Sequence, residues 1–144
     1  PSPLLTTTTM IQNDDSVRQV IAAKLIAHNQ GVAGASGHQV LGIPVQEGGL
    51  WGITSYGWLY IQMLVVPEAL RGQGVGARLV REAEQEALRR GCHHAWVDTQ
   101  FGARGFYERL GYRCFGELTD YPAGFTRTFL SKKLDVFSGA GHTP

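Results

Sequence analysis

The stretch over residues 69–80, ALRGQGVGARLV, holds the residues with the clearest chemical use. Three glycines, at positions 72, 74 and 76, follow Arg71 and precede an amphipathic helical pattern. Because glycine has no side chain, such a loop lets its backbone come close to another molecule. The start of the following helix would present unpaired N–H groups and a partial positive charge. The sequence therefore predicts a site for an anionic group, most simply a phosphate.

Three kinds of phosphate loop are compared with this stretch. A Walker A loop needs Gly-Lys-Ser/Thr after four spacer residues, which this chain lacks. A dinucleotide fingerprint is met by Gly72-x-Gly74-x-x-Ala77, with Asp98 ending the next predicted strand. However, residues 67–71 separate the glycines from their strand, and too little chain follows Asp98 for a second half of a doubly wound sheet. A nicotinamide cofactor is therefore disfavoured.

The third pattern is Arg71-x-x-Gly74-x-Gly76, preceded by MLVVP and followed by the amphipathic helix. A later segment, ARGFYERLGYRCFGEL, has the form A-x-x-F-Y-x-x-x-G-Y, and DYPAGFTRTFLSKKL follows it. Together these segments resemble the GNAT superfamily of N-acetyltransferases, the last one resembling a bacterial subgroup. The resemblance covers residues 50–134.

The resemblance implies acetyl-CoA as cosubstrate and direct acetyl transfer to an amine in a ternary complex, with no metal. It also implies an α+β fold of three layers, in which helices flank a mixed, mostly antiparallel sheet. The pantetheine arm is expected in a gap between the strands at 58–66 and 95–98. The expected acetyl-CoA contacts are Leu64, Val65, Val66, Arg71, Gly72, Gln73, Gly74, Val75, Gly76, Ala77 and Ala103.

Acetyl transfer needs a neutral amine and a protonated or stabilised CoA thiolate. A lysine-like amine of pKa about 10.4 is less than about 0.1% neutral at pH 7. The F-Y pair of the family carries its general acid on the tyrosine, here Tyr107. Phe106 and Leu110 are expected to form the apolar face of their short helix, with Tyr107 turned off it.

The general base stays open. Many GNAT relatives have a glutamate where this chain has Gln62, so Asp98, Asp120 and a water chain are the alternatives. A catalytically silent acyl-CoA-binding or interaction module is accordingly the alternative function. A group of aromatic residues could line the acceptor site, or fill the core and a homodimer contact: Trp51, Tyr56, Trp58 and Tyr60.

Hydrophobic and β-branched periodicities predict the elements that must position these residues. We expect one domain over residues 1–134 and a flexible tail over 135–144. Helices are predicted over residues 14–29, 74–90 and 103–110, and strands over 4–11, 39–45, 50–54, 58–66, 95–98, 112–118 and 125–134.

The composition limits the partners. The chain has 144 residues, 43% of them hydrophobic and 17% charged, and a formal net charge of +1. This composition is typical of a soluble globular protein. The small net charge gives no strong electrostatic field that would attract nucleic acid or an anionic membrane. The longest apolar run is much shorter than the roughly 20 residues of a membrane span. Two cysteines and no basic N-terminal leader favour the cytoplasm, and adjacent Cys92, His93 and His94 do not make a zinc site.

Overall fold

A computed structural model of the chain describes residues 10–135, which belong to two compact units, residues 1–36 and 37–144. The predicted first strand, over residues 4–11, lies mostly outside the described residues. Its last two residues, Met10 and Ile11, are described and are not in a strand. The predicted tail also lies outside the described residues, apart from Asp135.

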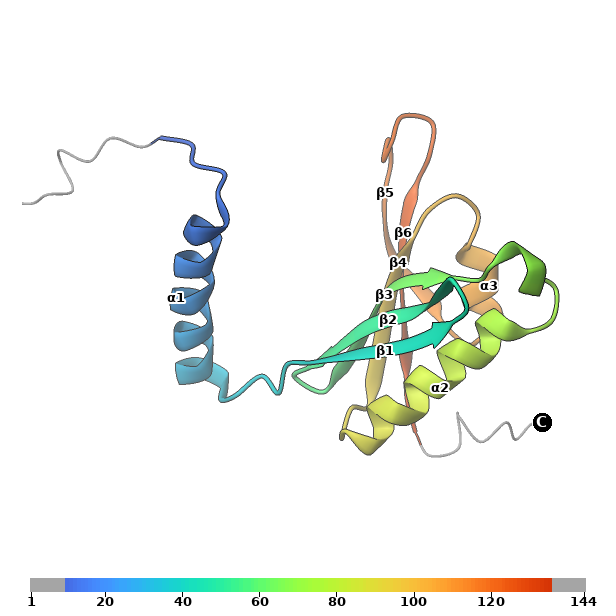
Figure 1. Cartoon of the computed structure of the whole chain (residues 1–144), viewed down its shortest axis with the longest axis horizontal. Coiled ribbons are helices and arrows are strands. Elements are labelled where there is room, and N and C mark those ends of the chain that lie inside the picture. Colours follow the sequence, from blue (N-terminus) through green and yellow to red (C-terminus); the bar gives the residue numbers. More distant parts are fainter. Residues whose placement is uncertain (1–9, 136–144) are drawn as a thin grey trace, which may run out of the picture. The chain divides into compact units, whose positions relative to one another are not determined.

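The described part of the first unit, residues 10–36, contains one helix, α1 (Asp15–Ala33) (Figure 1). Asp14 caps it, because its carboxylate accepts the N–H of Val17 at 3.3 Å. The helix continues beyond the predicted end at residue 29 and stops at Gly34, whose φ of 82° suits a residue without a side chain.

The second unit is built on a six-stranded sheet of order β1-β2-β3-β4-β6-β5 (Figure 1). Only β3 and β4 run parallel, and the other four neighbouring pairs are antiparallel. This confirms the predicted mixed, mostly antiparallel sheet. The strands are β1 (Gln39–Val45), β2 (Gly48–Ser55), β3 (Trp58–Val65), β4 (His94–Thr99), β5 (Arg113–Leu118) and β6 (Arg127–Lys133).

Two helices pack against the same hydrophobic core on one side of this sheet, α2 (Val75–Arg89) and α3 (Arg104–Arg109) (Figure 1). The helical spacing of apolar residues in α2 explains its burial, because they form one stripe towards the sheet. Gly91, with φ of 86°, follows its end, as the sequence predicts. The buried apolar residues of α2 are Val75, Leu79, Val80, Ala83 and Ala87.

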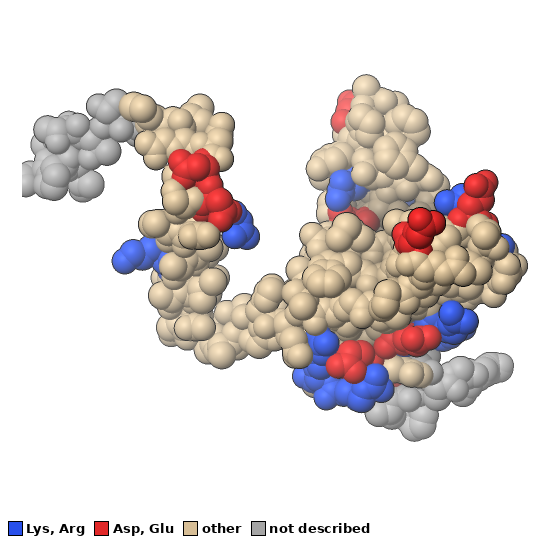
Figure 2. Space-filling model, viewed as in Figure 1, with Lys and Arg blue, Asp and Glu red and all other residues tan. Residues whose placement is uncertain are grey.

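The opposite face of α2 carries charges of both signs. Arg78 pairs with Glu82 at 3.4 Å, and Arg90, just after the helix, pairs with Glu86 at 2.9 Å. Figure 2 shows basic and acidic side chains interspersed along this edge of the unit rather than separated into two patches. An exposed pair such as Arg78–Glu82 adds little stability, but the mixture of signs avoids a strong field of one sign.

Strand β3 lies in the middle of the sheet and carries apolar residues on both faces, but only one face is buried. Leu59 and Ile61 are buried towards the core, whereas Trp58, Met63 and Val65 are exposed. The reason is that α2 and α3 both cover the face carrying Leu59 and Ile61.

Candidate active site

Strands β3 and β4 separate part-way along their length. Their parallel pairing begins at Trp58↔His94 and ends at Ile61↔Val97, although β3 continues to Val65 and β4 to Thr99. Among the described residues, therefore, no strand pairs with the β4 side of β3 beyond Ile61. This confirms the gap between these strands that the resemblance implies.

A β-bulge lies at the same point. The register of β2 against β3 passes from Gly52↔Ile61 to Trp51↔Met63, which leaves Gln62 without an opposite residue. A bulge bends its strand and increases the local twist. We attribute the separation of β3 from β4 in part to this bulge.

A cleft occupies the gap. It is lined by the ends of both strands and by the beginning of α3, and it contains Gln62, Leu64, Ala103 and Tyr107. Of the expected acetyl-CoA contacts, Leu64 and Ala103 thus line the same cleft as the expected acid. The other lining residues are Ile61, Met63, Val97, Asp98, Thr99, Gln100, Phe101, Phe106 and Arg127.

The glycine loop lies between a short 3-10 helix, η2 (Glu68–Leu70), and the start of α2. Gly72 and Gly74 have φ values of 78° and 76°, a conformation that side chains rarely adopt. Gly74 caps α2 without a side-chain hydrogen bond, so the first N–H groups of the helix have no intrahelical partner. Arg71 folds back, its Nε donating to the carbonyl of Val66 at 3.1 Å. The loop therefore offers mainly backbone donors.

Gly76 has a different role from the other two glycines. A Cβ at this position would lie 3.3 Å from the Phe106 ring and 3.3 Å from Val66, whereas Gly72 and Gly74 face open space. The absence of a side chain at Gly76 lets α2 approach α3 and the end of β3. A side chain at Gly76 is therefore expected to crowd Phe106 and Val66.

Tyr107 is the buried residue of α3, with 5% of its surface exposed. Phe106 and Leu110 are only partly buried, so the expected pattern is reversed: Tyr107 enters the core and the cleft wall. Its ring packs edge-on against Phe106 and Tyr112. Burial, and secondarily the negative charge of Asp98, raises the pKa of Tyr107 to about 12. The phenol is therefore protonated at neutral pH, as a general acid must be.

Asp98 lines the cleft, and each of its two carboxylate oxygens already accepts a hydrogen bond. Its Oδ1 accepts the hydroxyl of Tyr60 at 2.7 Å, and its Oδ2 accepts Nε of Arg127 at 2.6 Å. Arg127 also donates to Gln100 at 3.2 Å. Burial and this carboxylate raise the pKa of Tyr60 to about 12. These contacts suit a role for Asp98 in holding the wall of the cleft better than a role in accepting a proton from the substrate.

The part played by Arg127 could not be read from the sequence. Asp98 at a strand end was a recognisable signal, but Arg127 becomes its partner only because β6 pairs with β4, which local spacing does not reveal.

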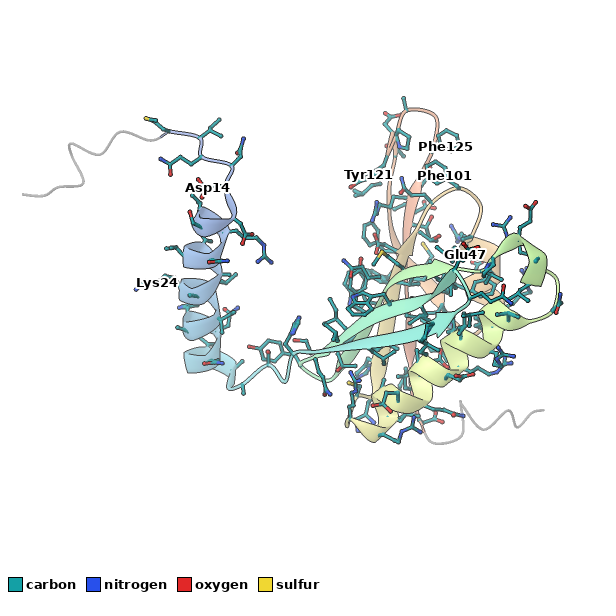
Figure 3. The ribbon with its side chains drawn as sticks, in the orientation of Figure 1. Asp14, Lys24, Glu47, Phe101, Tyr121 and Phe125 are labelled. Carbon is teal, nitrogen blue, oxygen red and sulfur yellow. The ribbon has the colours of Figure 1, made fainter. Side chains whose placement is uncertain are left out.

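The other candidate base, Asp120, is exposed in the turn between β5 and β6 and is not among the described residues that line the cleft. Nearby, Phe101 and Phe125 pack edge to face with ring centroids 5.0 Å apart. Figure 3 shows these two rings side by side at the end of the β5–β6 hairpin, with Tyr121 on the same hairpin. Of these aromatic residues only Phe101 lines the cleft, and Phe125 packs against it from the β5–β6 hairpin.

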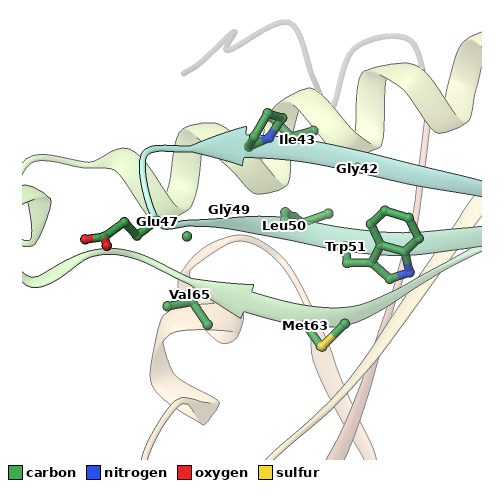
Figure 4. Close-up of a pocket in the computed structure, with 10 residues that line it drawn as sticks. Gly42, Ile43, Glu47, Gly49, Leu50, Trp51, Met63 and Val65 are labelled. Carbon is green, nitrogen blue, oxygen red and sulfur yellow. The ribbon is translucent and has the colours of Figure 1, made fainter.

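The four aromatic residues predicted as candidates for the acceptor site, at positions 51–60, do not line the cleft. Trp51 lines a separate shallow pocket on β1–β3 with Met63 and Val65 (Figure 4). Tyr60 stacks on Trp96, and Trp58 stacks on His94. Of the four predicted candidates, only Tyr60 reaches the cleft, through Asp98.

A metal-ligand cluster and a membrane-spanning helix are both absent from residues 10–135. Within that range, no three His, Cys, Asp or Glu side chains gather where they could hold a metal ion. No helix in that range is both long and apolar enough to cross a membrane.

Comparison with known proteins identifies relatives of this chain. The sequence model described as the acetyltransferase (GNAT) family matches residues 10–112. "Acetyltransferase Atu2258" of Agrobacterium fabrum is 39% identical, over 84% of this chain and 93% of the relative. Blasticidin-S acetyltransferase of Streptomyces morookaense is 43% identical over 60% of this chain and 65% of the relative. A crystal structure from Agrobacterium tumefaciens, assigned as an acetyltransferase, has a TM-score of 0.82 at 37% identity, covering 89% of this chain and 98% of the other.

Proposed function

This chain belongs to the GNAT family of acetyltransferases, and we propose that it transfers the acetyl group of acetyl-CoA directly to a primary amine in a ternary complex. The observation that carries the proposal is the meeting of three features in one place. The gap between β3 and β4 and the protonated Tyr107 share one cleft, and helix α2, which follows the glycine loop, lies against Phe106 of α3 at Gly76.

The residues fit acetyl-CoA. The N–H groups over residues 71–77 would hold the pyrophosphate, with glycines at 72 and 74 giving open space for approach. Leu64, Val65 and Val66 would pair through their backbone with the pantetheine arm, because the β4 side of β3 is free there. Ala103 would contact the same arm from the start of α3. Bound acetyl-CoA supplies an activated acetyl thioester.

Tyr107 would act as the general acid. The residue lines the cleft, and no side-chain oxygen among the described residues is both buried and without a hydrogen bond, so the Tyr107 hydroxyl is free to donate to the departing sulfur. As the neutral amine nitrogen bonds to the carbonyl carbon, the C–S bond of the thioester breaks, the O–H bond of Tyr107 breaks and the S–H bond forms. The nitrogen loses its remaining extra proton to solvent, and the phenolate regains its proton from solvent. A positioned acid of this kind contributes about 10²–10⁴ in rate.

Asp98 would hold the cleft wall rather than take the proton of the amine. Tyr60 and Arg127 occupy its two oxygens, and Gln62 cannot accept a proton at neutral pH. The amine would therefore lose its proton to water before attack. On this account the rate follows the fraction of neutral amine.

The test is release of CoA thiol from acetyl-CoA with a panel of primary amines. Blasticidin S is included because one relative is named for acetylating it. Turnover on at least one amine class, together with thermal protection by acetyl-CoA, is expected. Protection without turnover on any small or peptide amine would instead support a silent acyl-CoA-binding module.

A further inference from the structure

A buried charged cluster lies behind the helix that carries Tyr107. Glu84, on α2, is 1% exposed, and its carboxylate accepts the Tyr112 hydroxyl at 2.7 Å. Lys132, on β6, donates to the same carboxylate at 3.1 Å. Burying a carboxylate is costly unless it is paired, and such a pair adds little net stability over apolar residues. Stability alone therefore explains this cluster poorly.

The cluster is bonded to the end of α3. Lys132 Nζ donates to the carbonyl of Leu110, the C-cap of α3, at 2.8 Å. The N–H of Tyr112 donates to the carbonyl of Tyr107 at 3.1 Å, and the rings of these two tyrosines pack edge-on with centroids 5.7 Å apart. Both the backbone and the ring of Tyr107 thus contact Tyr112, whose hydroxyl is held by Glu84.

Helix α3 needs this support because it has only six residues. Isolated helices shorter than about 12 residues are marginal, so tertiary contacts must fix α3. A displacement of about 1 Å in a reacting group can cost about 10² in rate. The position of the Tyr107 hydroxyl therefore depends on what anchors the end of its helix.

We propose that Glu84 is a positioning residue for Tyr107: with Lys132 and Tyr112 it fixes the C-terminal end of α3, so that the Tyr107 hydroxyl stays aimed into the cleft. The proposal rests on the proposed function, because it takes Tyr107 as the acid. It assigns a catalytic consequence to a residue that touches no substrate.

The test is a double-mutant cycle between positions 84 and 107. Glu84→Gln keeps the shape and an acceptor for Tyr112 but removes the charge that holds Lys132. We expect it to lower kcat about tenfold in the wild-type background and less than twofold in Tyr107→Phe, with the KM for acetyl-CoA little changed. A merely structural role would lower kcat by the same factor in both backgrounds and would overturn the proposal.

Two controls keep the test decisive. Glu82→Gln removes a carboxylate from the exposed face of the same helix and should leave kcat unchanged. If thermal melting shows that Glu84→Gln does not fold, Tyr112→Phe replaces it in the cycle, since it removes only the hydroxyl that Glu84 accepts.

The outcomes separate this inference from the function on which it rests. Equal effects of Glu84→Gln in both backgrounds, with kcat lowered by Tyr107→Phe, would reject only the positioning role. An active enzyme with an unchanged kcat in Tyr107→Phe would reject the acid, and with it this inference.

Discussion

At the scale of single residues, environment decides which ionisable groups can act. Tyr107 is a usable acid because burial raises its pKa to about 12 and its hydroxyl adjoins the cleft. Asp98 is also in the cleft, but Tyr60 and Arg127 hold both of its oxygens. The F-Y pair suggested Tyr107 and the end of a strand suggested Asp98, but only their partners in the structure distinguish the two roles.

Asp98→Asn should weaken the cleft wall without changing the proton chemistry. The variant loses charge-assisted hydrogen bonds with Arg127, whose cost is about 2 kcal/mol of unfolding free energy. We expect a lower melting temperature and a higher KM for the amine. The pH profile of kcat/KM should keep its shape, because the amine loses its proton to water.

One result would contradict the prediction that Asp98 takes no part in proton transfer. If Asp98→Asn lowered kcat by about 10² or more at every pH while the protein stayed folded, Asp98 would be the base after all. Measurements of initial rates between pH 6 and pH 10, with thermal melts at each pH, check this.

At the scale of elements, the site is produced by the end of a strand pair and the start of a helix. The amphipathic pattern of α2 and its glycine ending were readable because they are local. The gap between β3 and β4 came from the family resemblance, and the structure adds its local cause, the bulge at Gln62. The role of Gly76 was not readable, because its neighbours Phe106 and Val66 are brought to it by tertiary packing.

Gly76→Ala should destabilise the protein although alanine is the better helix former. The substitution gains up to about 1 kcal/mol in helix propensity. Crowding against Phe106 and Val66 should cost more, because overpacking costs about 1–3 kcal/mol. Urea unfolding measures the difference.

Gly105→Ala is the matched control, because a Cβ there would meet only the flexible end of Arg109 at 3.4 Å. It should be neutral or stabilising. A Gly76→Ala protein as stable as Gly105→Ala would show that α2 and α3 are not packed as described.

At the scale of the whole molecule, the fold was largely predictable and its buried polar contacts were not. All six strands of the second unit and both of its helices lie where periodicity predicts them, within a few residues at each end. Glu84 is an example of a buried polar residue that the sequence does not reveal. Its charge gives no sign that it lies in the core, because its partners Tyr112 and Lys132 are distant in sequence.

The three buried or half-buried tyrosines should make the protein sensitive to alkali. Burial raises the pKa of Tyr60, Tyr107 and Tyr112 above that of an exposed tyrosine. In the unfolded chain they ionise near pH 10, so the unfolded state binds fewer protons above that pH. The unfolding free energy should therefore be intact below about pH 9 and fall from pH 10 upward.

Urea unfolding of wild type and Tyr107→Phe at pH 8 to 11 checks this. The variant should lose less stability per pH unit above pH 10, by up to about 1.4 kcal/mol. An identical slope in both proteins would mean that Tyr107 ionises as an exposed tyrosine does.

The most direct test of the central claim is the kcat of Tyr107→Phe on the best amine of the panel. Tyr56→Phe, which removes a hydroxyl from the exposed β2–β3 turn, is the matched control. We predict that kcat falls at least about tenfold in Tyr107→Phe and is unchanged in Tyr56→Phe, with acetyl-CoA affinity kept in both. A Tyr107→Phe enzyme with wild-type kcat would contradict the account, because the cleft would then work without its acid.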